Sequence, residues 1–139
     1  MNTIRTIATV FGAVYVIIGL AGFLPALVTG SAPPDMPSAD GNLLGIFPIN
    51  ALHNIVHLVI GAALLYGSTQ TDRARAVARI VGIVYAAVGV LGLIAPDTFG
   101  LMPIGGADVA LHLLTAAILL YIGFMADRQG EPTNASATR

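Results

Sequence analysis

Four long apolar stretches constrain the fold of this chain more than any other feature. They lie near residues 5–28, 48–67, 76–95 and 105–126, and polar segments separate them. A helix of about 20 apolar residues crosses a hydrocarbon core roughly 30 Å thick. Inside lipid, backbone polar groups must be paired within helices or closed barrels. The sequence therefore predicts an all-α integral membrane protein, a four-helix transmembrane bundle.

The composition agrees with a membrane protein and excludes several other classes. Of the 139 residues, 56% are hydrophobic and 9% are charged, whereas soluble domains have about 25% charged residues. The formal net charge of -1 leaves no basic surface for a nucleic-acid backbone, so we expect no nucleic-acid partner. Because the chain has no cysteine, it can form neither disulfides nor thiolate metal sites.

The segments between the apolar stretches are predicted to be loops. Residues 29–42, TGSAPPDMPSADGN, include three prolines and predict an exposed loop. Residues 67–76 are polar and rich in arginine, and residues 95–103 predict a tight turn. We expect one membrane domain over residues 1–126 and a disordered cytoplasmic tail over 127–139, where apolar side chains are too few to form a core.

The positions of the arginines predict the orientation in the membrane. They lie before the first stretch, between the second and third, and after the fourth: Arg5, Arg73, Arg75, Arg79, Arg128 and Arg139. The two opposite loops carry only Asp35, Asp40 and Asp97 as charged residues. Since cytoplasmic loops are enriched in Lys and Arg, we expect a multi-pass protein with both termini in the cytoplasm.

The second half of the chain resembles the first. GAVYVIIGLAGFLP (12–25) matches GIVYAAVGVLGLIAP (82–96), and GIFPINALHNIVHLVIGAALLY (45–66) matches GLMPIGGADVALHLLTAAILLY (100–121). The sequence therefore predicts two tandem homologous helical hairpins, about 5–67 and 76–126, related by a pseudo-twofold axis along the membrane normal.

A stripe of small residues recurs in the first helix of each hairpin. The stripe includes a tyrosine, Tyr15 or Tyr85, and three glycines at matching positions: Gly12, Gly19, Gly22 and Gly82, Gly89, Gly92. Small residues on one helix face let two backbones approach closely in lipid. We interpret these glycines as helix-packing positions.

Polar residues gather on one face at the start of the second stretch. Asn50, His53, Asn54 and His57 are spaced to share a helix face. On the fourth stretch the matching face carries Asp108 and His112, with Gly105 and Thr115. If the pseudo-twofold axis brings both faces together, the candidate cluster consists of His53, His57, Asp108 and His112, with Asn50, Asn54, Tyr15 and Tyr85 in support. We identify no catalytic residue.

Three interpretations of this cluster remain open. In the first interpretation, the cluster is a hydrogen-bonded structural network, because buried polar groups in lipid must be paired. Alternatively it binds a divalent metal ion such as zinc, copper or iron, since imidazoles at i and i+4 can hold one ion; haem belongs to the same class. In the third interpretation, an Asp–His pair serves proton-coupled transport or pH sensing.

The chain resembles a family of small bacterial four-helix membrane proteins described only as a domain of unknown function. The resemblance rests on the Gly-x-Val-Tyr-x3-Gly pattern of the first stretch and on GIFPINALHNIVHLVIG, residues 45–61. It implies a multi-pass protein of the bacterial inner (plasma) membrane and carries no activity over. A looser likeness, of architecture alone, is to the small four-helix proteins that accompany quinone oxidoreductases.

The favoured function is therefore non-enzymatic. We expect a structural or accessory membrane component, forming a homo-oligomer or part of a larger membrane complex, whose cluster is structural or binds a metal. The alternatives are a proton-coupled carrier of small solutes and a redox subunit linked to haem or quinone.

Overall fold

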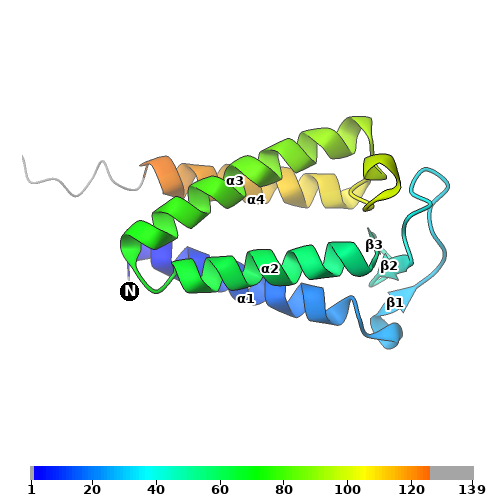
Figure 1. Ribbon diagram of the computed structural model, residues 1–139, viewed down its shortest axis with the longest axis horizontal. Coiled ribbons are helices and arrows are strands. Elements are labelled where there is room, and N and C mark those ends of the chain that lie inside the picture. Colours follow the sequence, from blue (N-terminus) through cyan, green and yellow to red (C-terminus); the bar gives the residue numbers. More distant parts are fainter. Residues whose placement is uncertain (1, 126–139) are drawn as a thin grey trace, which may run out of the picture.

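Four α-helices form two layers in the computed structural model, which describes residues 2–125. Helices α1 (Thr3–Ala21) and α2 (Ala51–Gly67) pack as one hairpin, and α3 (Thr71–Ile94) and α4 (Ala107–Met125) pack as the other. All four helices run along the long axis of the molecule (Figure 1). The predicted all-α, four-helix fold is confirmed. The predicted disordered tail, 127–139, lies outside the described residues.

Three of the helices suit a membrane by length and composition. α1, α3 and α4 are long and apolar enough to cross a bilayer, and α2 is an apolar helix of 17 residues, at the lower end of the length that a span needs. Large apolar side chains such as Ile17, Ile80 and Leu93 are exposed on the outer faces, while the histidines are buried. This distribution, with polar groups inside and apolar groups outside, is the one expected in lipid.

Helix α3 begins earlier than the sequence predicted. Only residues 68–70 separate α2 from α3, so Arg73 and Arg75 belong to the first turns of α3 rather than to a loop. Asp72 lies in that first turn, where a negative charge offsets the helix dipole. Arginine is also a good helix former, so α3 extends on the N-terminal side of its apolar part.

The predicted outer loop contains a small antiparallel sheet. Its strands are β1 (Val28–Thr29), β2 (Gly41–Leu43) and β3 (Phe47–Ile49), in the order β1-β2-β3. Met36, between β1 and β2, is buried rather than exposed. The Ser38 amide and hydroxyl both donate to Asp97 Oδ1, which joins this segment to the loop between α3 and α4. The two loops together therefore cover one end of the bundle.

Glycines set the closest approaches within each hairpin. A Cβ atom on Gly12 would lie 2.9 Å from the Leu65 amide nitrogen, and one on Gly19 would lie 2.9 Å from the Asn54 carbonyl oxygen. In the second hairpin, Gly82 and Gly89 face Leu120 and Leu113 at similar distances.

The remaining glycines of the predicted stripe also lie at helix contacts. Gly22 faces the Asn54 side chain, and Gly92 faces Val109 and the Ile104 carbonyl. In the sequence alignment of the two halves, Asn54 and Val109 occupy matching positions. The two hairpins thus make corresponding contacts, although the internal repeat itself stays a prediction from the sequence.

Candidate metal centre

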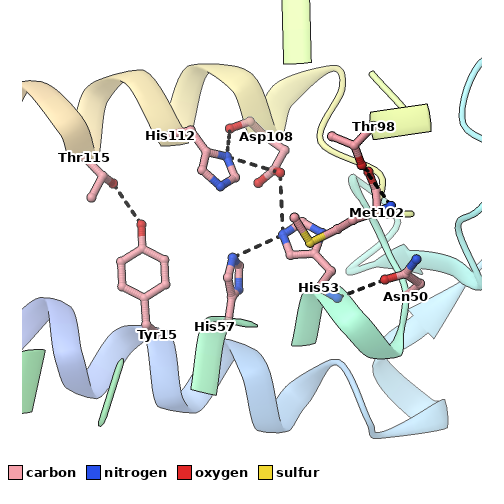
Figure 2. A network of polar contacts seen from close by, with 9 residues as sticks. All are labelled: Tyr15, Asn50, His53, His57, Thr98, Met102, Asp108, His112 and Thr115. Atoms are coloured by element: carbon pink, nitrogen blue, oxygen red, sulfur yellow. Dashed lines mark hydrogen bonds and ion pairs between the residues drawn. The ribbon is translucent and has the colours of Figure 1, made fainter. Parts of the chain in front are cut away.

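The three histidines of the chain and Asp108 form one cluster, in which His53 and His112 contact Asp108 and His57 contacts His53 (Figure 2). His53 and His57 come from the first two turns of α2, and Asp108 and His112 from the first two turns of α4. Asn50 starts α2 as its N-cap, because its side-chain oxygen accepts a hydrogen bond of 2.9 Å from the His53 amide. The structure therefore brings together the four residues that the spacing grouped.

The cluster is compact. His53 Nε2 lies 3.1 Å from His57 Nε2 and 3.6 Å from Asp108 Oδ2. Asp108 Oδ2 also lies 3.3 Å from His112 Nδ1. One ring nitrogen from each histidine can be chosen so that all three lie within 4.8 Å of one another. The 4.8 Å limit is wider than the roughly 3.4 Å between ligand atoms of a tetrahedral zinc site, so the three nitrogens surround a candidate ion position without closing on it.

The position of His112 is fixed by its own helix. Its Nδ1 lies 2.9 Å from the Asp108 carbonyl oxygen, as expected when that nitrogen carries the proton and donates. Figure 2 shows the other ring nitrogen of His112 turned toward His53 and His57. Metal-binding histidines commonly donate one N–H to a carbonyl or carboxylate, which leaves the second nitrogen to bind the ion.

Buried charge is the main electrostatic feature of the site. Asp108 is 4% exposed and His53 is 1% exposed, and a carboxylate buried in this way needs a positive charge beside it. Arg5 and Arg79 cannot supply that charge, because they bind the carbonyl oxygens of Ser68 and Gly123, near the α2–α3 connection at the opposite end of the bundle. Among the described residues, a proton on an imidazole would supply such a charge, and so would a bound cation.

Several buried polar atoms of the site accept or donate no hydrogen bond. Among residues 2–125 they include His53 Nδ1, His57 Nδ1 and Asp108 Oδ2. A completed hydrogen-bonded network would satisfy them, since most buried polar groups in proteins are paired. The cluster therefore has unused capacity to bind a ligand.

The two tyrosines form one side of the cluster. The Tyr15 ring contacts His57 edge-on with centroids 5.2 Å apart, and the Tyr85 ring contacts His112 at 4.8 Å. The Tyr15 hydroxyl donates to Thr115 Oγ1 at 3.0 Å, so this bond links α1 to α4. Tyr15 and Tyr85 thus hold the imidazole rings in place from the direction of the bundle centre.

The two asparagines lie beside the cluster and contact the segments around it. The Asn50 amide donates to the carbonyl oxygens of Ser38 and Leu101, so it ties both outer loops to the start of α2. The Asn54 side chain lies against Gly22 at the α1–α2 contact. Both share a helix face with the histidines, but they fix loops and helices around the cluster instead of joining it.

Sequence reasoning missed the cavity beside the cluster. It has a volume of about 270 Å³ and is lined by residues of α1, α4 and the β2–β3 segment together with the cluster residues. Of the residues that line the cavity outside the predicted cluster, the sequence had pointed only to Tyr15 and to Thr115, which lies three residues after His112 on the same helix face. The leucines of the β2–β3 segment gave no signal, because nothing in their spacing placed them over the histidines.

The comparisons with known proteins give a family and no activity. Residues 5–125 match the family described as Domain of unknown function (DUF4383). Neither the curated proteins nor the solved structures include a significant match.

Proposed function

We propose that this chain, which belongs to the family described as Domain of unknown function (DUF4383), binds one divalent transition-metal ion at its His/Asp cluster. The observation that carries the proposal is the convergence of three buried imidazole nitrogens within 4.8 Å beside a buried carboxylate. Imidazole and carboxylate ligands suit zinc best, and also iron and copper.

The spacing of the ligand atoms supports zinc. In a tetrahedral site with bonds of about 2.0–2.1 Å, ligand atoms lie roughly 3.4 Å apart. The Nε2 atoms of His53 and His57 are 3.1 Å apart, and Asp108 Oδ2 is 3.6 Å from His53 Nε2. Small side-chain movements would therefore complete the site. Haem is less suitable, because a macrocycle would have to fit between two nitrogens that are already this close.

A metal ion would also balance the buried charge. Asp108 contributes one negative charge and a dication two positive charges, so the ion neutralises the carboxylate without a proton on an imidazole and leaves one net positive charge shared with the imidazole ligands. The ion would connect α2 of the first hairpin with α4 of the second. Its proposed role is that of a structural link in an accessory membrane protein. Assembly with a second copy or with other subunits stays a prediction.

A zinc titration of the metal-free, detergent-purified full chain tests the proposal. We expect one zinc per chain, and we expect Asp108→Asn to weaken binding at least about 10-fold, because it replaces a proposed carboxylate ligand by a neutral amide. Asp35→Asn is the matched control, because Asp35 is exposed in the loop between β1 and β2. Equal affinities for both variants, or no saturable binding to wild type, would contradict the metal site.

The proposed orientation places both termini in the cytoplasm of a bacterial inner-membrane protein. Arg5, Arg73 and Arg75 lie at one end of the bundle and the small sheet at the other, which supports an outward-facing sheet. A phosphatase reporter inserted at Asp35 is expected to be active outside, and one inserted at Asp72 inactive. The reverse pattern of activities would show that the orientation is wrong.

A further inference from the structure

The cavity beside the cluster lies between α1 and α4, under the β2–β3 segment. Its α1 wall includes Phe11, Val14 and Ile18, and its α4 wall includes Leu111, Leu114 and Ile118. Its polar end is formed by the cluster and by the hydrogen-bonded pair Tyr15 and Thr115. The cavity is therefore mainly apolar, with a small polar end at the cluster.

The cavity opens sideways between two helices that suit a membrane. Val14 on α1 and Leu114 on α4 line it and are 44% and 59% exposed. α1 and α4 are both apolar enough to cross a bilayer, so these exposed apolar side chains border lipid. On the other side of the bundle α2 packs against α3. A molecule dissolved in the bilayer could therefore enter between α1 and α4 without passing through water.

Two buried polar atoms at the polar end have no hydrogen-bond partner among residues 2–125, although Asp108 Oδ2 lies 3.3 Å from His112 Nδ1 and 3.6 Å from His53 Nε2. His57 Nδ1 and Asp108 Oδ2 belong to buried side chains that line the cavity, and neither atom forms a hydrogen bond. A ligand that reaches them needs a polar head, since leaving such groups unpaired costs free energy. Saturated hydrocarbon alone would not satisfy them.

Aromatic rings favour a planar head group. Phe11, Tyr15 and Phe47 line the cavity together with the imidazoles, and aromatic rings gain from stacked and edge-to-face contacts with another ring. An apolar cavity of about 150 Å³ holds one benzene molecule. A volume of about 270 Å³ is therefore enough for a substituted single ring, with an alkyl tail leaving through the opening into lipid.

We propose that this cavity binds a lipid-soluble molecule with a planar ring bearing hydroxyl or carbonyl oxygens, of the quinone or phenol class, with an oxygen at the His/Asp cluster. The proposal goes beyond the metal site and does not require the ion, because the unpaired groups and the apolar walls are features of the chain itself. It concerns binding only and includes no chemical step.

The test is calorimetric titration of the detergent-purified chain with a ten-carbon-tailed benzoquinone. We expect saturable one-to-one binding to wild type, and at least tenfold weaker binding to Leu114→Trp, whose larger side chain fills the opening. Leu93→Trp is the matched control: Leu93 is 66% exposed on α3 and lies outside the cavity lining. Binding of the control should equal that of wild type.

The comparison ligand is a saturated ten-carbon alcohol, which has a polar head without a ring. Equal affinity for the alcohol and the benzoquinone, or equal benzoquinone affinity of the two Trp variants, would overturn the proposal. If Leu114→Trp fails to fold, Val14→Phe narrows the opening from α1 and should give the same loss. All titrations are repeated with and without zinc: zinc binding without benzoquinone binding would contradict this proposal alone, and the opposite result would contradict the metal site alone.

Discussion

His57→Ala is expected to bind zinc at least about 100-fold more weakly than wild type, a larger loss than removal of an outer-shell partner causes. His57 Nε2 lies 3.1 Å from His53 Nε2 at the centre of the cluster. Alanine would leave two imidazoles and one carboxylate, and no other histidine or cysteine exists in the chain to replace the lost ligand. His112→Ala should give a similar loss, because it also removes one of three imidazoles.

Thermal unfolding provides a second measurement of the same effect. A ligand at 100 times its dissociation constant stabilises the folded state by about 2.7 kcal/mol, so zinc should raise the unfolding temperature of wild type and not that of His57→Ala. Tyr66→Ala is the control, since Tyr66 is an exposed aromatic residue elsewhere on α2. A cluster that is only a structural network would instead show lower stability of His57→Ala in the absence of zinc and no response of either protein to zinc.

Gly61→Val is expected to destabilise the fold by about 3 kcal/mol or more, at the upper end of the cost of overpacking. A Cβ atom on Gly61 would lie 2.8 Å from the Gly12 carbonyl oxygen and 2.8 Å from the Val16 amide nitrogen. Both are backbone atoms that cannot rotate away, so α1 and α2 would have to separate. In lipid this separation loses the close packing that holds helices together.

The matched control for this substitution is Ala62→Val, the next residue on the same helix, which is exposed. It adds two methyl groups to the outer face and should change stability by less than about 0.5 kcal/mol, as is usual for surface substitutions. Urea or heat denaturation in detergent measures both variants. Equal stabilities of Gly61→Val and Ala62→Val would show that the α1–α2 contact is not as close as described.

The helices and the cluster could be predicted because both depend on periodic spacing. Apolar length predicted the four helices, and residues three and four apart placed His53 beside His57 and Asp108 beside His112. The sequence comparison of the two halves then placed the two faces opposite each other, with His53 and Asp108 at matching positions. In the structure His53 Nε2 and Asp108 Oδ2 are 3.6 Å apart.

The small sheet and the asparagine roles could not be predicted in this way. Strands β1, β2 and β3 are two or three residues long, too short for alternation of polar and apolar residues to be recognised. Asn50 shares a face with the histidines, but its function depends on the carbonyl oxygens of Ser38 and Leu101 in two separate loops. Such contacts between distant segments leave no pattern in the sequence.

The cavity depends on the same long-range packing. Its walls come from α1 and α4, and its roof includes Leu43, Leu44 and Phe47. Leu44 has a positive φ of 54°, a backbone conformation that non-glycine residues rarely adopt. Asn42 and Gly45 lie nearby and favour a turn, but position 44 itself holds leucine, so its positive φ and the roof that it forms could be found only in the structure.

X-ray absorption at the zinc edge of the zinc-loaded wild-type protein is the most direct test of the proposed metal centre. We predict a first shell of nitrogen and oxygen atoms only, at about 2.0–2.1 Å, with outer-shell scattering from three imidazole rings. His57→Ala, loaded at a zinc concentration sufficient for occupancy, should lose the scattering of one ring. A spectrum of hydrated zinc without imidazole scattering in the wild-type protein would contradict the metal centre.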